Sequence, residues 1–249
     1  MKNLRQIFPF KKRILILSPH PDDDCIGMGA TIYFLKKKNN KIKIFYLTSG
    51  WRGVRGKISK KEKINLRRKE AISACKILGL SRSALKFLSL PFYEKKKICL
   101  KDIEILAQGI KDFHPEIIFT CGKENDPHYT HKRSVELLEK TLKKIDPLCP
   151  LFIYRVWKDF KKFDLYFPFG RELMERKIKA IKAHKSQWIP KYAKGKIISF
   201  WKREERINKI YGERLRRMGL IKGEKFLFAE VFKAWPDNPE EICHLRDKK

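Results

Sequence analysis

The feature that most constrains this chain is a repeated alternation of short apolar runs with helix-length amphipathic segments. The apolar runs, which are typical of strands, lie at 13–18, 41–48, 85–90, 116–121 and 151–157. The segments with helical spacing lie between them, at 28–38, 62–78, 100–113 and 131–145. Such alternation predicts an α/β fold with a Rossmann-like, mainly parallel sheet and helices on both of its faces.

The alternation ends after residue 157. We expect two further strands at 163–169 and 225–233, and two helices at 171–184 and 204–218. No Pro-, Gly- or Ser-rich linker separates this part from the first, and its many aromatic residues favour packing against it. The sequence therefore predicts a single domain over 1–249, with a core at about 13–187 and a C-terminal α+β extension at about 188–249 packed on it.

Charge makes polyanions candidate partners. The 249 residues include 59 Lys and Arg against 28 Asp and Glu, a net charge of +31. Such a field attracts nucleic acid, but the basic residues are spread along the whole chain, which predicts only non-specific binding through the basic surface. No run reaches the roughly 18 apolar residues of a membrane helix, and the first residues lack the apolar stretch of a signal peptide, so we expect a cytoplasmic protein. The pattern indicates no oligomeric state.

A first cluster of chemically active side chains follows the first predicted strand. It contains His20 and three successive carboxylates, Asp22, Asp23 and Asp24. Adjacent carboxylates repel one another, and together with histidine they favour zinc or another divalent metal. The alternative is a negatively charged cap on the following helix, which the helix dipole would stabilise.

A second cluster follows the fourth predicted strand. Asp126, His128 and His131 lie where the next helix begins, and the spacing of three places both histidines on one helix face. Taken alone, this spacing favours two unrelated surface histidines over a metal site. In doubly wound sheets, however, the first and fourth strands are commonly neighbours, and the loops at their carboxyl ends form a crevice. The two clusters together therefore predict a metal site.

These motifs resemble those of the PIG-L or LmbE-like family of zinc-dependent N-acetylglucosaminyl deacetylases. Residues 18–24 are similar to the family's Ala-His-Pro-Asp-Asp-Glu, and residues 128–131 to its His-Pro-Asp-His. Two further motifs match at Arg67-x-x-Glu70-Ala71 and at residues 179–187, Lys-Ala-x-x-x-His-x-Ser-Gln. The resemblance covers about three quarters of the chain.

The resemblance implies a metal-dependent hydrolase that removes the acetyl group from an N-acetylglucosamine-type amino-sugar conjugate. It implies His20, Asp23 and His131 as zinc ligands. It implies Asp22 as the general base for the attacking water, and His128, as an imidazolium, as the donor to the oxyanion. The resemblance does not identify the rest of the conjugate, which could be inositol, a malate-type thiol precursor, an oligosaccharide or a lipid-linked sugar. A non-enzymatic polyanion-binding protein and a metallophosphoesterase are the alternatives.

Three positions depart from the family pattern. Thr130 stands where relatives often have aspartate between the histidines, and Asp126 is a candidate for that missing carboxylate. Asp24 replaces glutamate, and Trp51 stands where relatives often have glutamate. These departures concern the choice of substrate.

Other candidates receive simpler interpretations. Arg52 and Arg67 are expected to be solvated or ion-paired, with contact to the sugar or an anionic group as the alternative. His184 is expected to pack or hydrogen-bond rather than to catalyse, and Cys25 is a weak candidate for a competing ligand.

Overall fold

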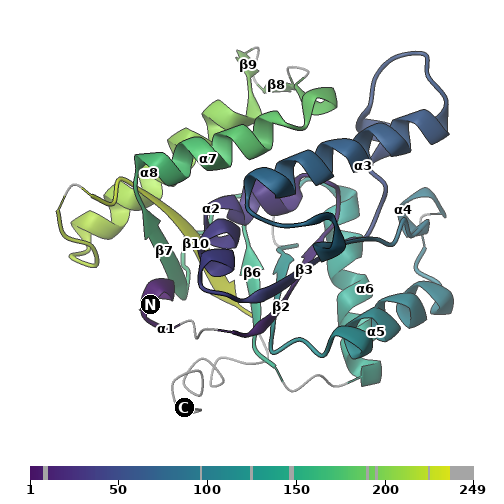
Figure 1. The fold of residues 1–249 in the computed structure, drawn as a ribbon, viewed down its shortest axis with the longest axis horizontal. Helices are drawn as coiled ribbons and strands as arrows, with labels where there is room; N and C mark the ends of the chain where they lie inside the picture. The colour runs from purple at the N-terminus through teal and green to yellow at the C-terminus, as the bar shows by residue number, and fades with distance from the viewer. Residues whose placement is uncertain are drawn as a thin grey trace.

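The computed structural model describes residues 1–7, 11–95, 97–123, 126–145, 149–188, 191–193, 196–223 and 225–235. Its main sheet has eight strands in the order β1-β7-β10-β6-β5-β2-β3-β4. The strand bounds are β1 Lys2–Asn3, β2 Arg13–Ser18, β3 Lys41–Tyr46, β4 Leu85–Phe87, β5 Ile117–Cys121, β6 Leu151–Tyr154, β7 Leu165–Phe169 and β10 Phe228–Ala234. A separate antiparallel hairpin pairs β8 (Lys191–Ala193) with β9 (Lys196–Ile198) (Figure 1).

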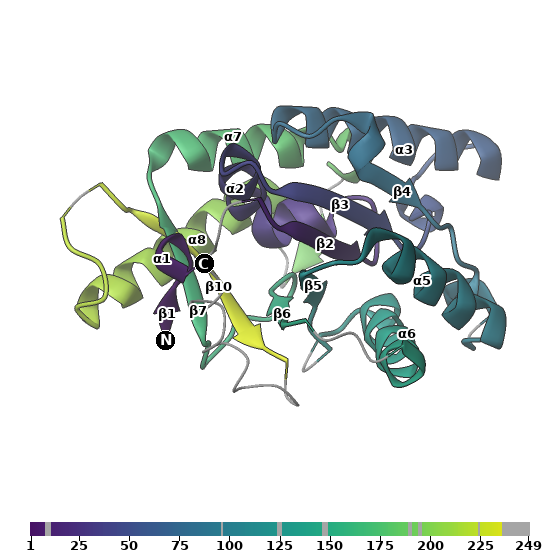
Figure 2. The same cartoon turned by 60° about the horizontal axis from the view of Figure 1, so that its bottom comes forward.

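Helices cover both faces of the sheet. Their bounds are α1 Leu4–Ile7, α2 Asp23–Lys37, α3 Lys60–Ile77, α4 Phe92–Lys95, α5 Leu100–Phe113, α6 Tyr129–Ile145, α7 Arg171–Lys182 and α8 Phe200–Arg217. Figure 2 shows α3 and α7 on one side of the sheet, and α5 and α6 on the other. The predicted α/β class is confirmed. No helix in the described ranges is long and apolar enough to cross a membrane.

The order of the strands reverses beside β2. This strand pairs in parallel with β3 on one side and with β5 on the other. The chain therefore continues outward through β3 and β4 in one direction, and through β5 and β6 in the other. The predicted adjacency of the first and fourth major strands is confirmed, and the loops that follow them open at the same edge. Leu15 and Ile16 of β2 are fully buried because helices cover both faces.

The last strand lies inside the sheet. β10 is antiparallel to both β6 and β7, with Phe232 opposite Tyr154 and Phe228 opposite Phe169. Helix α8 packs against β10. The C-terminal part is therefore joined to the preceding residues by backbone hydrogen bonds as well as by side-chain packing.

Helix α2 is made of two segments joined at Met28, whose φ of −145° is not helical. The carboxylate of Glu230 on β10 accepts the backbone N–H groups of Ala30 and Thr31 at 3.0 and 2.8 Å. A buried Lys177 Nζ lies 2.7 Å from the same carboxylate. Glu230 therefore caps the second segment, while the first turn follows its own direction.

The first turn of α2 also depends on close packing. A Cβ atom on Gly27 would lie 2.3 Å from Cδ2 of Tyr154 and 2.7 Å from the carbonyl oxygen of Arg155. Only glycine permits this approach. The sequence predicted that this helix begins at residue 28, whereas it begins at Asp23 because the kink breaks the apolar periodicity.

Candidate active site

The two predicted clusters meet where β2 and β5 end. Nδ1 of His20 lies 3.0 Å from Oδ2 of Asp23. Nε2 of His131 lies 3.2 Å from the same oxygen and 3.3 Å from Nδ1 of His20. Three donor atoms from the loop after β2, the first turn of α2 and the first turn of α6 thus converge on one point.

These donor atoms fit a metal ion in type and spacing. Zinc takes imidazole nitrogen and carboxylate oxygen at about 2.0 to 2.2 Å, which in a tetrahedron separates ligand atoms by about 3.3 to 3.6 Å. The observed separations of 3.0 to 3.3 Å are close to that range. His128 and Asp22 also offer donor atoms within 4.8 Å of His20 and its partners. The cluster could therefore hold a metal.

Asp126 orients the second cluster. Its Oδ2 lies 2.9 Å from Nδ1 of His131, and its Oδ1 accepts the backbone N–H of His128 at 2.7 Å. A carboxylate on Nδ1 leaves Nε2 directed toward Asp23, as is common for histidines that bind metals. The sequence offered Asp126 as a partner for His128, whereas its contact with an imidazole is with His131.

The electrostatics of the cluster favour an ionised carboxylate. Burial alone would raise the pKa of Asp23, but the charges of His131 and His20 and their hydrogen bonds hold it well below its usual range. Burial lowers the pKa of His131, yet Asp23 and Asp126 outweigh burial and raise it to about 10. Asp23 is therefore in the form that binds cations.

The three successive aspartates face three different environments. Asp22 occupies the helix N-cap position, but its side chain makes no capping hydrogen bond. Asp23 faces the histidines, and Asp24 is buried next to the hydroxyl groups of Tyr46 and Ser18 at 3.3 and 3.4 Å. Burial, followed by repulsion from Asp22 and Asp23, raises the pKa of Asp24 to about 7. A simple helix cap does not explain this arrangement.

The two additional sequence motifs, around Arg67 and at residues 179–187, contact each other next to Asp22. Nη2 of Arg67 lies 3.1 Å from Oδ1 of Asp22, and Nη1 lies 3.6 Å from Oε2 of Glu70. Glu70 in turn accepts the N–H and the hydroxyl of Ser186 at 2.6 and 2.7 Å. Arg67 is 1% exposed, so the expectation of an ion-paired arginine is confirmed in a buried setting.

A cavity of about 500 Å³ opens over the cluster, within the usual size range of small-molecule sites. Arg52, Arg55 and Arg67 contribute to its lining, as do the aromatic rings of Trp157 and Phe200. Trp157 stacks toward His128 with ring centroids 6.5 Å apart. Trp157 is not recognisable as a site residue from the sequence, because a lone tryptophan after a strand belongs to no motif.

Three more candidates find structural explanations. Cys25 donates its thiol to the carbonyl oxygen of Asp22 at 3.1 Å, and burial raises its pKa well above the usual range, so it is not a thiolate ligand. Trp51 begins a 3₁₀ turn, Trp51–Gly53, and its Nε1 donates to Glu94 at 3.0 Å. Thr130 is buried and lines the cavity.

The family follows from comparison with known proteins. The family model described as PIG-L, GlcNAc-PI de-N-acetylase, matches residues 15–142, about half of the chain. The chain belongs to the PIG-L family. The match includes both clusters and all five residues proposed for the site.

Two curated relatives are each 26% identical to this chain. One is a putative glucosamine-6-phosphate deaminase-like protein of Bacteroides thetaiotaomicron, aligned over 87% of this chain. This chain spans 42% of that relative's length. The other is a probable N-acetyl-alpha-D-glucosaminyl L-malate deacetylase 2 of Bacillus subtilis, aligned over 71% of this chain and 84% of the relative.

Two solved structures share the fold. The N,N'-diacetylchitobiose deacetylase of Pyrococcus horikoshii has a TM-score of 0.66 at 22% identity, over 90% of this chain and 84% of the other. The 4-carboxy-2-hydroxymuconate hydratase of Pseudomonas putida has a TM-score of 0.71 at 19% identity, over 92% and 98%. At such identities the likeness concerns the fold alone.

Proposed function

We propose that the protein is a zinc-dependent N-deacetylase that releases acetate from an N-acetylglucosamine-type conjugate. The observation that carries the proposal is the convergence of His20, Asp23 and His131 within 3.3 Å of one another beneath a cavity of about 500 Å³. The family description and the name of the Bacillus subtilis relative support the same reaction class.

His20, Asp23 and His131 would hold the metal. Zinc supplies Lewis acidity, which makes water a better nucleophile and an amide carbonyl a better electrophile near neutral pH. On metal binding, His131 would release the proton that Asp23 and Asp126 hold on it in the metal-free cluster, so that the three side chains would contribute two neutral nitrogens and one carboxylate. Three protein ligands would leave a position open to substrate and water.

Asp22 would act as the general base. Arg67 lies against its Oδ1 at 3.1 Å, so Oδ2 is the oxygen that would accept a proton from the attacking water. Asp22 lines the cavity beside the cluster, within reach of a molecule bound there. The ion pair with Arg67 holds one oxygen of this carboxylate, Oδ1.

His128 would stabilise the oxyanion. Its ring lies 4.7 Å from the ring of His20 and 4.8 Å from that of His131, measured between centroids. From there it can donate to the carbonyl oxygen as the amide carbon becomes tetrahedral. When the C–N bond breaks, Asp22 returns its proton to the departing nitrogen, and the products are acetate and a free amine.

The lining of the cavity suits an amino-sugar conjugate. Trp157 and Phe200 contribute apolar ring surface to the lining, and the guanidinium groups of Arg52 and Arg55 contribute positive charge. A sugar ring offers both an apolar face and hydroxyl groups, so it matches such a mixed lining.

An acetate-release screen tests the proposal. The purified protein would be incubated with N-acetylglucosaminides that carry neutral, acidic, saccharide and lipid aglycones, with and without added zinc. We expect acetate and free amine in equal amounts from at least one conjugate, at a rate that Asp22→Asn lowers by at least about 100-fold. Release of phosphate from phosphorylated sugars, or hydration of a double bond, without any acetate would replace the proposal with another hydrolase or with a hydratase.

The alternative is a polyanion-binding protein without catalysis, and the effect of salt distinguishes it from the proposed enzyme. If the protein is the proposed enzyme, binding of heparin or DNA through the +31 surface should be sequence-independent and should weaken steeply as salt rises. Deacetylation of a neutral conjugate should change little over the same range. Tight binding to one nucleic-acid sequence at physiological salt, in a protein that releases no acetate, would favour the alternative.

A further inference from the structure

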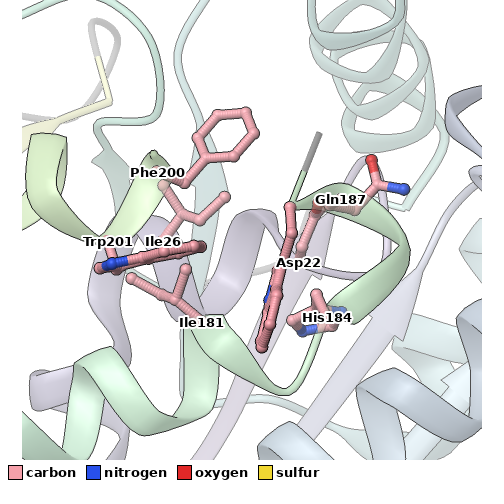
Figure 3. A pocket seen from close by; sticks show the side chains of 8 residues that line it. Asp22, Ile26, Ile181, His184, Gln187, Phe200 and Trp201 are labelled. Carbon is pink, nitrogen blue, oxygen red and sulfur yellow. The ribbon is translucent and has the colours of Figure 1, made fainter. Parts of the chain in front are cut away.

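A second, small cavity lies beside the proposed base. It measures about 10 Å³, which is roughly the space that one water molecule occupies. Figure 3 shows Asp22, His184 and Gln187 along one side of it, and Ile26, Ile181 and Trp201 along the other. The polar groups are therefore gathered on one wall.

His184 is the unusual member of this wall. It follows α7 and is only 2% exposed. Neither Nδ1 nor Nε2 has a hydrogen-bond partner among the described residues. Buried polar atoms are nearly always satisfied by protein groups or by ordered water, so an imidazole with two unsatisfied nitrogens points to a bound molecule.

The imidazole is neutral. Burial, followed by the positive charge of Arg67, lowers the pKa of His184 to about 3. A neutral imidazole has one N–H donor and one acceptor nitrogen. It can therefore donate to a water oxygen at any pH at which a hydrolase of this kind would work.

We propose that the small cavity binds one water molecule, which accepts a hydrogen bond from His184 and donates one to the carboxylate of Asp22. His184 is then a positioning residue, because it acts on the proposed base through the water. The role assigned to Asp22 rests on the proposed deacetylase function, whereas the water site rests on the cavity and the imidazole alone.

The position of Asp22 explains why a second contact matters. Arg67 lies against one carboxylate oxygen, and the side chain makes no capping bond to the helix that it precedes. A single ion pair leaves rotation about the Cβ–Cγ bond open. The bridging water adds a second fixed point for the carboxylate, and small displacements of a reacting group are costly to the rate.

A high-resolution crystal structure of the wild-type protein tests the site without any assay. We expect an ordered water within about 3.2 Å of a ring nitrogen of His184 and of an oxygen of Asp22. In His184→Leu that water should be lost. A well-ordered cavity with no water density in the wild-type protein would overturn the proposal.

Kinetics test the positioning role. His184→Leu should lower kcat about tenfold or more with little change in KM or in bound zinc, and His184→Gln, whose amide can still bind the water, should recover part of the loss. Met174→Leu, a buried substitution on α7, is the matched control and should keep the wild-type kcat. A purely structural role predicts instead that activity follows Tm in all three variants, and wild-type kcat in His184→Leu would overturn the positioning role. If the wild-type protein releases no acetate, the proposed function fails, and the crystallographic result still decides the water site.

Discussion

Oδ2 of Asp126 lies 2.9 Å from Nδ1 of His131, while Oδ1 of the same carboxylate accepts the backbone N–H of His128. One side chain thus orients a proposed ligand and fixes the backbone of the proposed oxyanion donor. Because the carboxylate polarises the imidazole of His131, it should also strengthen the bond that His131 makes to a metal.

Asp126→Asn should therefore weaken zinc binding by about 10- to 100-fold while leaving the fold intact. The amide keeps an acceptor oxygen but loses the negative charge. Competition with a zinc chelator measures the change, and Asp112→Asn, at an exposed position on α5, is the matched control. Equal affinity in the two variants would contradict the role of Asp126.

The zinc content of variants should distinguish the proposed metal ligands from the proposed base. Wild-type protein should carry about one zinc per chain, and His20→Ala, Asp23→Ala and His131→Ala should lose most of it, because each removes one of three protein donors. Asp22→Asn should retain it. Elemental analysis of the purified wild-type protein and variants measures the zinc bound per chain. Zinc retained in all three alanine variants would remove the metal site, and zinc lost from Asp22→Asn would mean that the two neighbouring carboxylates are assigned the wrong way round.

His184 should make the free energy of unfolding decrease at acidic pH. Its pKa of about 3 in the folded protein lies below the usual value of 6.5, so the unfolded chain binds one more proton between these pH values. The free energy of unfolding should then decrease as the pH falls below 6.5, by about 1.4 kcal/mol per pH unit from this group.

Urea unfolding of the wild-type protein and of His184→Leu isolates that component. Between pH 7.5 and pH 5.0 the wild-type protein should lose about 2 kcal/mol more than the variant, since the leucine cannot take up the proton. Parallel losses in the two proteins would show that His184 titrates normally in the folded state.

Removal of one partner from the buried ion pair of Lys177 and Glu230 should strongly destabilise the fold. Lys177→Met leaves the Glu230 carboxylate buried without its cation, and we expect a loss of about 3 to 5 kcal/mol of unfolding free energy. Lys209→Met, which removes an exposed ion pair on α8, should cost less than about 0.5 kcal/mol. Similar losses in chemical denaturation would contradict the account of the kink in α2.

Much of the fold could be predicted from the sequence, because the strands and helices that carry it have strong periodicity. Helix α5 begins and ends where its pattern predicts, and β2 does as well. Helix α2 does not, because its first turn depends on the close approach of Gly27 to Tyr154 and its second segment is capped by Glu230, and the local apolar pattern contains neither contact. The short elements α1, α4 and β1 were not predicted, since two to four residues have no measurable period.

The site was predictable in its residues but not in its supporting contacts. Two motifs and the rule for neighbouring strands placed the clusters around His20 and His131 together, as the structure confirms. The contact of Asp126 with His131, and the approach of Arg67 to Asp22, depend on side-chain directions across separate elements. His184 was expected only to pack or hydrogen-bond, because its burial beside Asp22 depends on the packing of α7 against α2 and α3, which the sequence does not show.

The proposed reaction of the cluster is the hydrolysis of an acetamide. The most direct measurement compares wild-type protein with Asp22→Asn, each shown to contain zinc, in a single assay that quantifies acetate and free amino sugar from an N-acetylglucosamine conjugate. We predict equimolar acetate and amine from the wild-type protein, and a rate for the variant that is lower by at least about 100-fold, the scale of a general base. Equal rates for the two proteins, or an absence of acetate across all conjugates with zinc bound, would contradict the account.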